Sequence, residues 1–349
     1  MKRAIPFGMP MEVMGVVRWI IFVASALWMM SLLGCGGGGK PTQTAQGGTI
    51  VITFQFPNSE RLIPSATTEI SVTVNGEGLS APLKGTATRA SPTVTFSNVP
   101  PGAKFVMAFS RTSSTASLPA TIGVATATVT AGVTTSVTIE MQATKPPSRL
   151  VVETPTAGQV TLINPDKEEL LFLGNSDGLQ WFGFVTPQAT VTFDNPVSLP
   201  NGASIGQSAS QTTLQGTATM RLVGVTGVGV PAGDFANCIV VELNHSDSSG
   251  SVSFRRILYL ARNFGPVMLF DGAPLGFAGQ PTALSSLPSV LVSGQVGTTS
   301  FNFANPFNDG LGLPAYDGQL SAYLATQVGN RYDFSDLLSP DNPPNQPPL

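Results

Sequence analysis

The chain has 349 residues, with 17 basic and 20 acidic side chains and a formal net charge of −3. This balance argues against nucleic-acid partners, which require basic stripes on the protein surface. Charged residues make up only 11% of the chain. Gly, Pro, Ser and Thr are abundant instead, which is typical of exported β-proteins.

The first 34 residues predict a secretory signal. Lys2, Arg3 and Arg18 supply positive charge, and an unbroken apolar run of 15 residues follows from Trp19 to Leu33. A transmembrane helix needs about 20 apolar residues, so a cleaved signal is favoured over a membrane-spanning anchor. Removing residues 1–34 leaves 315 residues with 14 basic and 19 acidic side chains. That length suits one large or two ordinary domains.

The end of this signal resembles a bacterial lipobox, carried by Leu32-Leu33-Gly34-Cys35. The resemblance implies cleavage before Cys35 and attachment of a diacylglycerol to its thiol, with palmitate-type acyl chains holding the protein at a membrane. Two or three such chains give a durable anchor, since each buried methylene contributes about 0.8 kcal/mol. Gly36 stands where inner-membrane lipoproteins often have Asp. The resemblance therefore implies a lipid-anchored protein of the cell envelope, sorted to the outer membrane if the organism has one.

Residues 35–47 are rich in Gly, Thr and Gln and predict a flexible linker. Residues 48–143 then alternate apolar and polar side chains in seven or so short runs separated by turn signals, which predicts a β-sandwich. The runs include Ile50–Phe56, Phe105–Phe109 and Val137–Met141. The turn Asn98-Val99-Pro100-Pro101-Gly102 also resembles that of transthyretin-like and carboxypeptidase-regulatory-like modules, which implies an accessory domain.

A stiff Pro-Pro break at residues 144–148 predicts a second linker, followed by an antiparallel β domain over residues 149–338. Residues 179–186 are apolar on both faces, with Leu179, Trp181 and Val185 alternating with Phe182 and Phe184. This pattern indicates a strand covered on both sides or lining a half-closed barrel. Trp181 is expected in the core rather than stacked on a sugar. Residues 339–349 predict a disordered tail.

Residues 228–241, with their Val-Pro-Ala-Gly-Asp-Phe-Ala-Asn-Cys core, and residues 254–267, which include Tyr259-Leu260-Ala261, are together similar to a pattern in uncharacterised bacterial envelope proteins. The resemblance covers about forty residues and implies a strongly curved antiparallel sheet, akin to lipoprotein-carrier half-barrels. Pro231-Ala232-Gly233 predicts a turn that starts a strand at Phe235, and residues 244–250 predict the return turn of a hairpin. The predicted fold is thus all-β, with an N-terminal β-sandwich and a curved antiparallel sheet or half-barrel.

The sequence offers few residues for catalysis. Gly174-Asn175-Ser176-Asp177-Gly178 matches a nucleophile-elbow string, and Ser176, Asp194 or Asp234, and His245 occur in hydrolase order. The string is followed by strand-like residues rather than a helix, and it also describes an ordinary turn. His245 lies beside turn residues and is expected to be exposed. Cys238 is expected to be a buried apolar side chain. No cofactor or metal site is predicted.

The sequence favours a non-catalytic, lipid-anchored cell-envelope protein with a binding or scaffolding role. A hydrophobic ligand such as a lipid or lipopeptide, held by the curved sheet, is one alternative, and an ordinary packed core is the other. The competing hypothesis is a serine hydrolase using Ser176 and His245. The predicted partners are a membrane, through the lipid on Cys35, and an envelope component or lipid ligand.

Overall fold

The computed structural model describes residues 46–54, 63, 66–143, 150–153, 159–164, 169–278, 288–308, 314–324 and 330–336. The signal, Cys35, the 144–148 linker and the 339–349 tail lie outside these residues. Residues 45–349 belong to one compact unit. Its regular structure in the described residues is made of strands and one short 3-10 helix, η1, at Leu320–Tyr323. The all-β prediction is confirmed.

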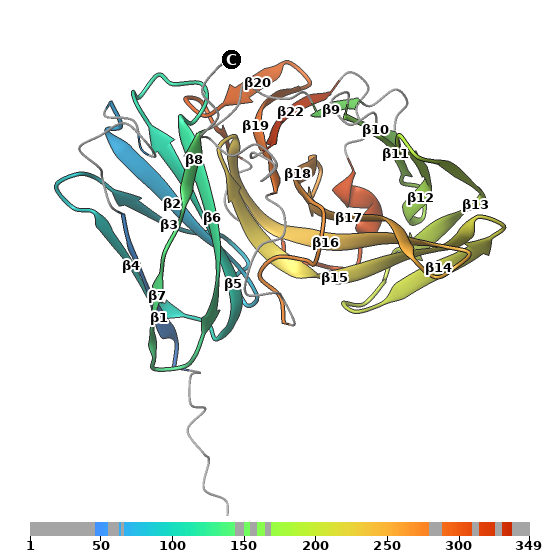
Figure 1. Ribbon diagram of the computed structural model, residues 1–349, viewed down its shortest axis with the longest axis horizontal. Coiled ribbons are helices and arrows are strands. Elements are labelled where there is room, and N and C mark those ends of the chain that lie inside the picture. Colours follow the sequence, from blue (N-terminus) through green and yellow to red (C-terminus); the bar gives the residue numbers. More distant parts are fainter. Residues whose placement is uncertain are drawn as a thin grey trace, which may run out of the picture. The chain divides into compact units, whose positions relative to one another are not determined.

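The N-terminal part is a β-sandwich (Figure 1). Its smaller sheet has the order β4-β1-β7, and its larger sheet has the order β3-β2-β5-β6-β8. Ile50 and Ile52 of the smaller sheet share one apolar core with Val72 and Val106 of the larger. The strands are β1 (Gly48–Thr53), β2 (Glu69–Gly76), β3 (Leu83–Ala87), β4 (Thr93–Val99), β5 (Gly102–Arg111), β6 (Thr121–Val129), β7 (Thr134–Val137) and β8 (Met141–Ala143).

The run from Val137 to Met141 differs from its prediction as a single alternating strand. β7 ends at Val137 and pairs with β1 in the smaller sheet, whereas β8 begins at Met141 and pairs with β6 in the larger sheet. The chain therefore crosses from one layer of the sandwich to the other within three residues. Alternation of side chains continues across such a crossing, so periodicity alone does not reveal it.

The remaining strands form one fourteen-stranded sheet, called the large sheet here. Its main path has the order β13-β12-β11-β10-β9-β22-β19-β18-β17-β16-β15-β14, with β20 paired to β19 and β21 to β16. The strands are β9 (Leu150–Glu153), β10 (Gln159–Asn164), β11 (Glu169–Gly174), β12 (Gly178–Val185), β13 (Thr190–Pro200), β14 (Ser208–Thr213), β15 (Gly216–Val230), β16 (Gly233–Asp247), β17 (Val252–Ala261), β18 (Gly265–Phe270), β19 (Ser289–Val296), β20 (Thr299–Asn302), β21 (Phe307–Asn308) and β22 (Arg331–Asp336).

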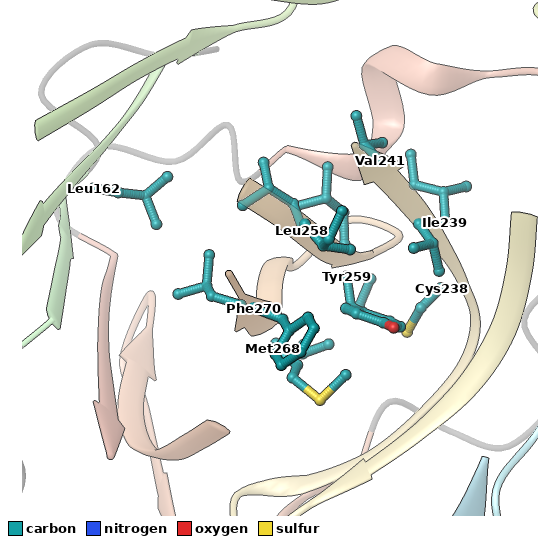
Figure 2. Packing of buried hydrophobic residues seen from close by; sticks show 14 of the residues in the cluster. Leu162, Cys238, Ile239, Val241, Leu258, Tyr259, Met268 and Phe270 are labelled. Carbon is teal, nitrogen blue, oxygen red and sulfur yellow. The ribbon is translucent and has the colours of Figure 1, made fainter. Parts of the chain in front are cut away.

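The large sheet curves so that strands far apart in its order face one another across a shared core (Figure 1). Figure 2 shows Leu162 of β10 pointing toward the side chains of β17, among them Leu258. Both side chains are at most 1% exposed. The curved sheet or half-barrel predicted from the sequence is confirmed.

β12 carries apolar side chains on both faces, as its sequence indicates, but in a different grouping. The pairing of β12 with β13 shifts register between Trp181 and Gly183. This irregularity places Phe184 in the core with Leu179 and Trp181, while Phe182 is only half-buried. A bulge changes the phase of a strand by one residue, so the strict alternation that grouped Phe184 with Phe182 was wrong.

β16 is longer than its sequence predicts. The strand continues through Asn244 and His245 to Asp247, and the hairpin turn lies at residues 248–251. His245 pairs with Phe254 of β17 and with Ala218 of β15, so its backbone lies inside the sheet. The side chain of His245 is 2% exposed. The expectation of an exposed turn histidine was therefore wrong, because long-range pairing on both sides outweighs the local turn composition.

The sandwich and the large sheet share buried contacts. β5 is covered on both faces: Val106 and Ala108 pack in the sandwich core, whereas Phe105, Met107 and Phe109 pack with the large sheet. A hydrogen bond also joins the two parts, since the Gly76 backbone N–H donates to the Thr226 side-chain Oγ1 at 2.8 Å. The 48–143 and 149–338 boundaries remain a prediction, because residues 144–149 lie outside the described residues.

Candidate functional site

The structure does not bring Ser176 and His245 together. Ser176 is exposed in the turn that precedes Gly178, the first residue of β12. The His245 ring instead contacts Phe184, near the other end of β12, with ring centroids 5.2 Å apart. Phe184 lies six positions along the extended strand from Gly178, a length on the order of 20 Å. The geometry needed for a Ser176–His245 nucleophile and base is absent.

The polar partner of His245 is Ser253. His245 Nδ1 and Ser253 Oγ are 2.6 Å apart. His245 Nε2 is buried and has no hydrogen-bond partner among the described residues. Burial lowers the pKa of His245, and the nearby Asp247 carboxylate opposes this effect. Burial therefore favours the neutral ring. A hydrolase triad also requires a carboxylate hydrogen-bonded to this ring, and the described part of the chain supplies none.

The two aspartates proposed as triad members lie elsewhere. Asp194 is exposed on β13. Asp234, at the start of β16, forms an ion pair with Lys84 of the sandwich. Both residues of this pair line a cleft of about 230 Å³ between β2, β3 and β5 on one side and the Pro231 turn on the other. Asp234 thus contributes an ion pair to the contact between the sandwich and the large sheet.

Aromatic side chains fill the inner side of the large sheet around His245. The Phe184 and Phe254 rings stack with centroids 4.3 Å apart, and Trp181 lies 5.8 Å from Phe254. Trp181 is fully buried, and its Nε1–H donates to the Gly183 carbonyl at 3.0 Å. The expectation that Trp181 belongs to the core is confirmed. At this end of the sheet, the facing strands pack on each other rather than around a ligand.

A buried cation also bridges the curve of the sheet. Arg256 of β17 forms ion pairs with Glu169 of β11 and with Asp271, whose Oδ1 is 2.6 Å from Arg256 Nε. Arg256 is 7% exposed. Burial by itself would lower the pKa of Arg256, but Asp271 and Glu169 together raise it. This cluster could not be predicted from the sequence, because Glu169 and Arg256 are 87 positions apart.

Cys238 lies in β16 and is fully buried, as the sequence predicts. Its Sγ lies 3.6 Å from the Phe235 carbonyl. A buried thiol among apolar side chains is not placed for nucleophilic chemistry. No group of three or more metal-binding side chains occurs in the part of the chain that the structure describes.

The candidate ligand site is a recess on the outer face of β10–β13. It has a volume of about 360 Å³ and is lined by the half-buried rings of Phe172 and Phe182, with Thr161 and Thr192 beside them. The buried residues Val160, Leu173 and Phe193 complete its lining. Its size and mostly apolar walls match ordinary small-ligand sites. No ionisable side chain lines it, so it suits an uncharged group.

The recess depends on the irregular pairing of β12. Gly183 lies beside the bulge with φ +148°, and a Cβ there would come within 2.3 Å of the Val191 carbonyl oxygen. A glycine is therefore required at this position. The two-faced apolar pattern of residues 179–186 predicts Phe182 on the face opposite Trp181, whereas Phe172 was not singled out from the sequence. The same two-faced apolar pattern in residues 170–173 was the available signal.

No known protein family, curated protein or solved structure matches this chain. The resemblances to transthyretin-like modules and to envelope proteins therefore stay expectations. Among the described residues, no helix has the length and apolar character needed to cross a membrane.

Proposed function

We propose that this chain is a non-catalytic, lipid-anchored protein of the cell envelope that binds an uncharged, largely apolar ligand in the recess between Phe172 and Phe182. The export signal and the lipid on Cys35 rest on the sequence alone, since both lie outside the described residues. The observation that carries the binding role is the recess itself. Two partly exposed aromatic rings line one hollow of the folded surface, where they can contact an apolar ligand.

The outer recess is favoured over the inner side of the curved sheet. Around His245, the inner side chains of β12, β16 and β17 contact one another through stacked rings. A ligand entering there would have to displace Phe184 or Phe254 from a packed core. The recess needs no such rearrangement, because Phe172 and Phe182 already face solvent in part.

Two measurements test the binding role. Native mass spectrometry of the chain from Gly36 onward would detect a co-purifying ligand. Titration with N-phenyl-1-naphthylamine, a neutral apolar fluorophore, would report an available apolar site. Phe172→Ala and Phe182→Ala should each weaken dye binding by about tenfold, the equivalent of roughly 1.4 kcal/mol of buried ring surface.

The matched control is Val223→Ala, which removes a half-buried apolar side chain from β15, outside the recess. This variant should bind the dye like the wild type. Equal dye binding by all four proteins, with no co-purified ligand, would rule out the recess as the binding site.

A further inference from the structure

The described residues include four large apolar side chains that are strongly exposed: Val133, Ile205, Leu214 and Val252. Leu214 is fully exposed, and Val252 is 60% exposed. Leu214 lies in the turn between β14 and β15, and Val252 begins β17 directly after the turn that follows β16. Turns usually carry Gly, Asn, Asp or Ser, so an apolar side chain directed into water there has no role in the fold itself.

These two turns lie at the same end of the large sheet. Gly216, the first residue of β15, pairs with Asp247, the last residue of β16. The turn between β12 and β13 lies at this end as well, because Gln215 Nε2 donates to the Thr190 carbonyl at 3.4 Å. These three turns, together with the strand residues that flank two of them, are called the rim here: residues 186–189, 213–216 and 247–252. Its exposed apolar side chains are Leu214 and Val252.

The rim is almost uncharged. Its polar groups are hydroxyls and amides, apart from Asp247. The Asp247 Oδ1 accepts hydrogen bonds from Ser249 N–H at 2.8 Å and from Ser251 N–H at 3.0 Å. The Asp247 carboxylate therefore stabilises the turn that follows β16. A surface with two projecting apolar side chains, hydrogen-bonding neighbours and no cation suits the headgroup region of an uncharged bilayer. It does not suit an anionic surface, which attracts Lys and Arg.

We propose that the rim docks onto the lipid bilayer, with Leu214 and Val252 inserted at the boundary between headgroups and acyl chains. The proposal rests on the proposed lipid tether. Two side chains alone give a weak contact, but tethering on a short flexible segment raises the local concentration to roughly the millimolar range. The rim would then hold the anchored protein in one orientation on the membrane.

The test uses the unlipidated chain from Gly36 onward, which contains the whole compact unit, and vesicles of zwitterionic phosphatidylcholine. Sedimentation at millimolar lipid should recover wild-type protein with the vesicles. The double variant Leu214→Ser/Val252→Ser should lower the bound fraction at least fivefold. Binding should be the same in 0.1 M and 0.5 M NaCl, because no ion pairs contribute.

The matched control is Val133→Ser/Ile205→Ser, which removes the other two exposed apolar side chains and should bind like the wild type. Circular dichroism and thermal unfolding must show both double variants folded. Absence of wild-type binding, equal losses in both double variants, or loss of binding at high salt would each overturn the proposal. Because this experiment contains no lipid on Cys35, its failure is separate from a failure of the tether.

Discussion

Arg256 of β17 forms an ion pair with Glu169 of β11, although five strands separate β11 from β17 in the order of the large sheet. The contact exists because the sheet curves back on itself, so it reports the curvature directly. Asp271 supplies a second carboxylate to the same guanidinium. One buried cation therefore holds two acidic groups and two distant parts of the sheet together.

Replacing Arg256 with Met should lower the free energy of unfolding by about 3 kcal/mol, because Glu169 and Asp271 both lose the buried guanidinium with which they pair. Urea denaturation followed by circular dichroism measures this loss. Adding Glu169→Gln to Arg256→Met should restore part of the lost stability, since one uncompensated carboxylate is then removed. Arg331→Met is the control: its exposed guanidinium pairs with Asp333 in its own strand, and its loss should cost less than about 1 kcal/mol. Similar losses in Arg256→Met and Arg331→Met would contradict this role.

His245 should make stability depend on pH. Burial lowers its pKa in the folded state below the ordinary value of about 6.5, so the unfolded chain takes up a proton first as pH falls. Stability from His245 is complete above pH 6.5 and is lost progressively below it. His245 is the single histidine of the chain, so no other imidazole contributes.

The measurement is the free energy of unfolding from pH 7.5 to pH 5.5 in wild type and in His245→Gln. The wild type should lose stability across this range, whereas the variant should show a flatter profile from a lower starting value. Parallel profiles would mean that His245 is protonated as easily in the folded protein as in the unfolded chain.

Thr226 should stabilise the contact between the sandwich and the large sheet. Its Oγ1 accepts from Gly76 N–H and donates to the Gly76 carbonyl at 3.0 Å, and Thr226 is fully buried. Thr226→Val keeps the shape but leaves both backbone groups without their partner, which should cost about 1–3 kcal/mol. Thr219→Val is the control, since Thr219 bonds Ser210 on an exposed face and its loss should change stability little. Thermal unfolding compares the two, and equal midpoints would show that this contact contributes nothing.

Local alternation predicts the sandwich and many strands of the large sheet, because each buried face leaves a period of two in the sequence. Prediction from alternation fails where a bulge or a crossing between sheets interrupts the strand. The bulge after Trp181 moves Phe184 into the core, and the crossing after Val137 divides one predicted strand between two sheets.

The position of β22 between β9 and β19 was not predictable either. The local sequence of residues 331–336 does not indicate which strands they pair with, and their partners in β9 lie more than 170 positions away. The environment of His245 shows the same limit. Its neighbours Ser246 and Asp247 indicate a turn, but pairing with β15 and β17 keeps the strand intact. The sequence shows that Phe172 and Phe182 are apolar residues in strand-like segments. The recess that they line could not be predicted, because it depends on Gly183 and the bulge beside it.

Measuring lipid attachment to Cys35 tests the proposed function most directly. Cells producing the full chain would be labelled with a palmitate analogue and separated into membrane and soluble fractions. Wild type and Cys238→Ala should carry the label and stay with the membrane, because Cys238 is buried in the folded chain. Cys35→Ala should lose the label and either leave the membrane or accumulate with its signal uncleaved. A Cys35→Ala protein that is labelled, migrates and fractionates like the wild type would contradict the central claim.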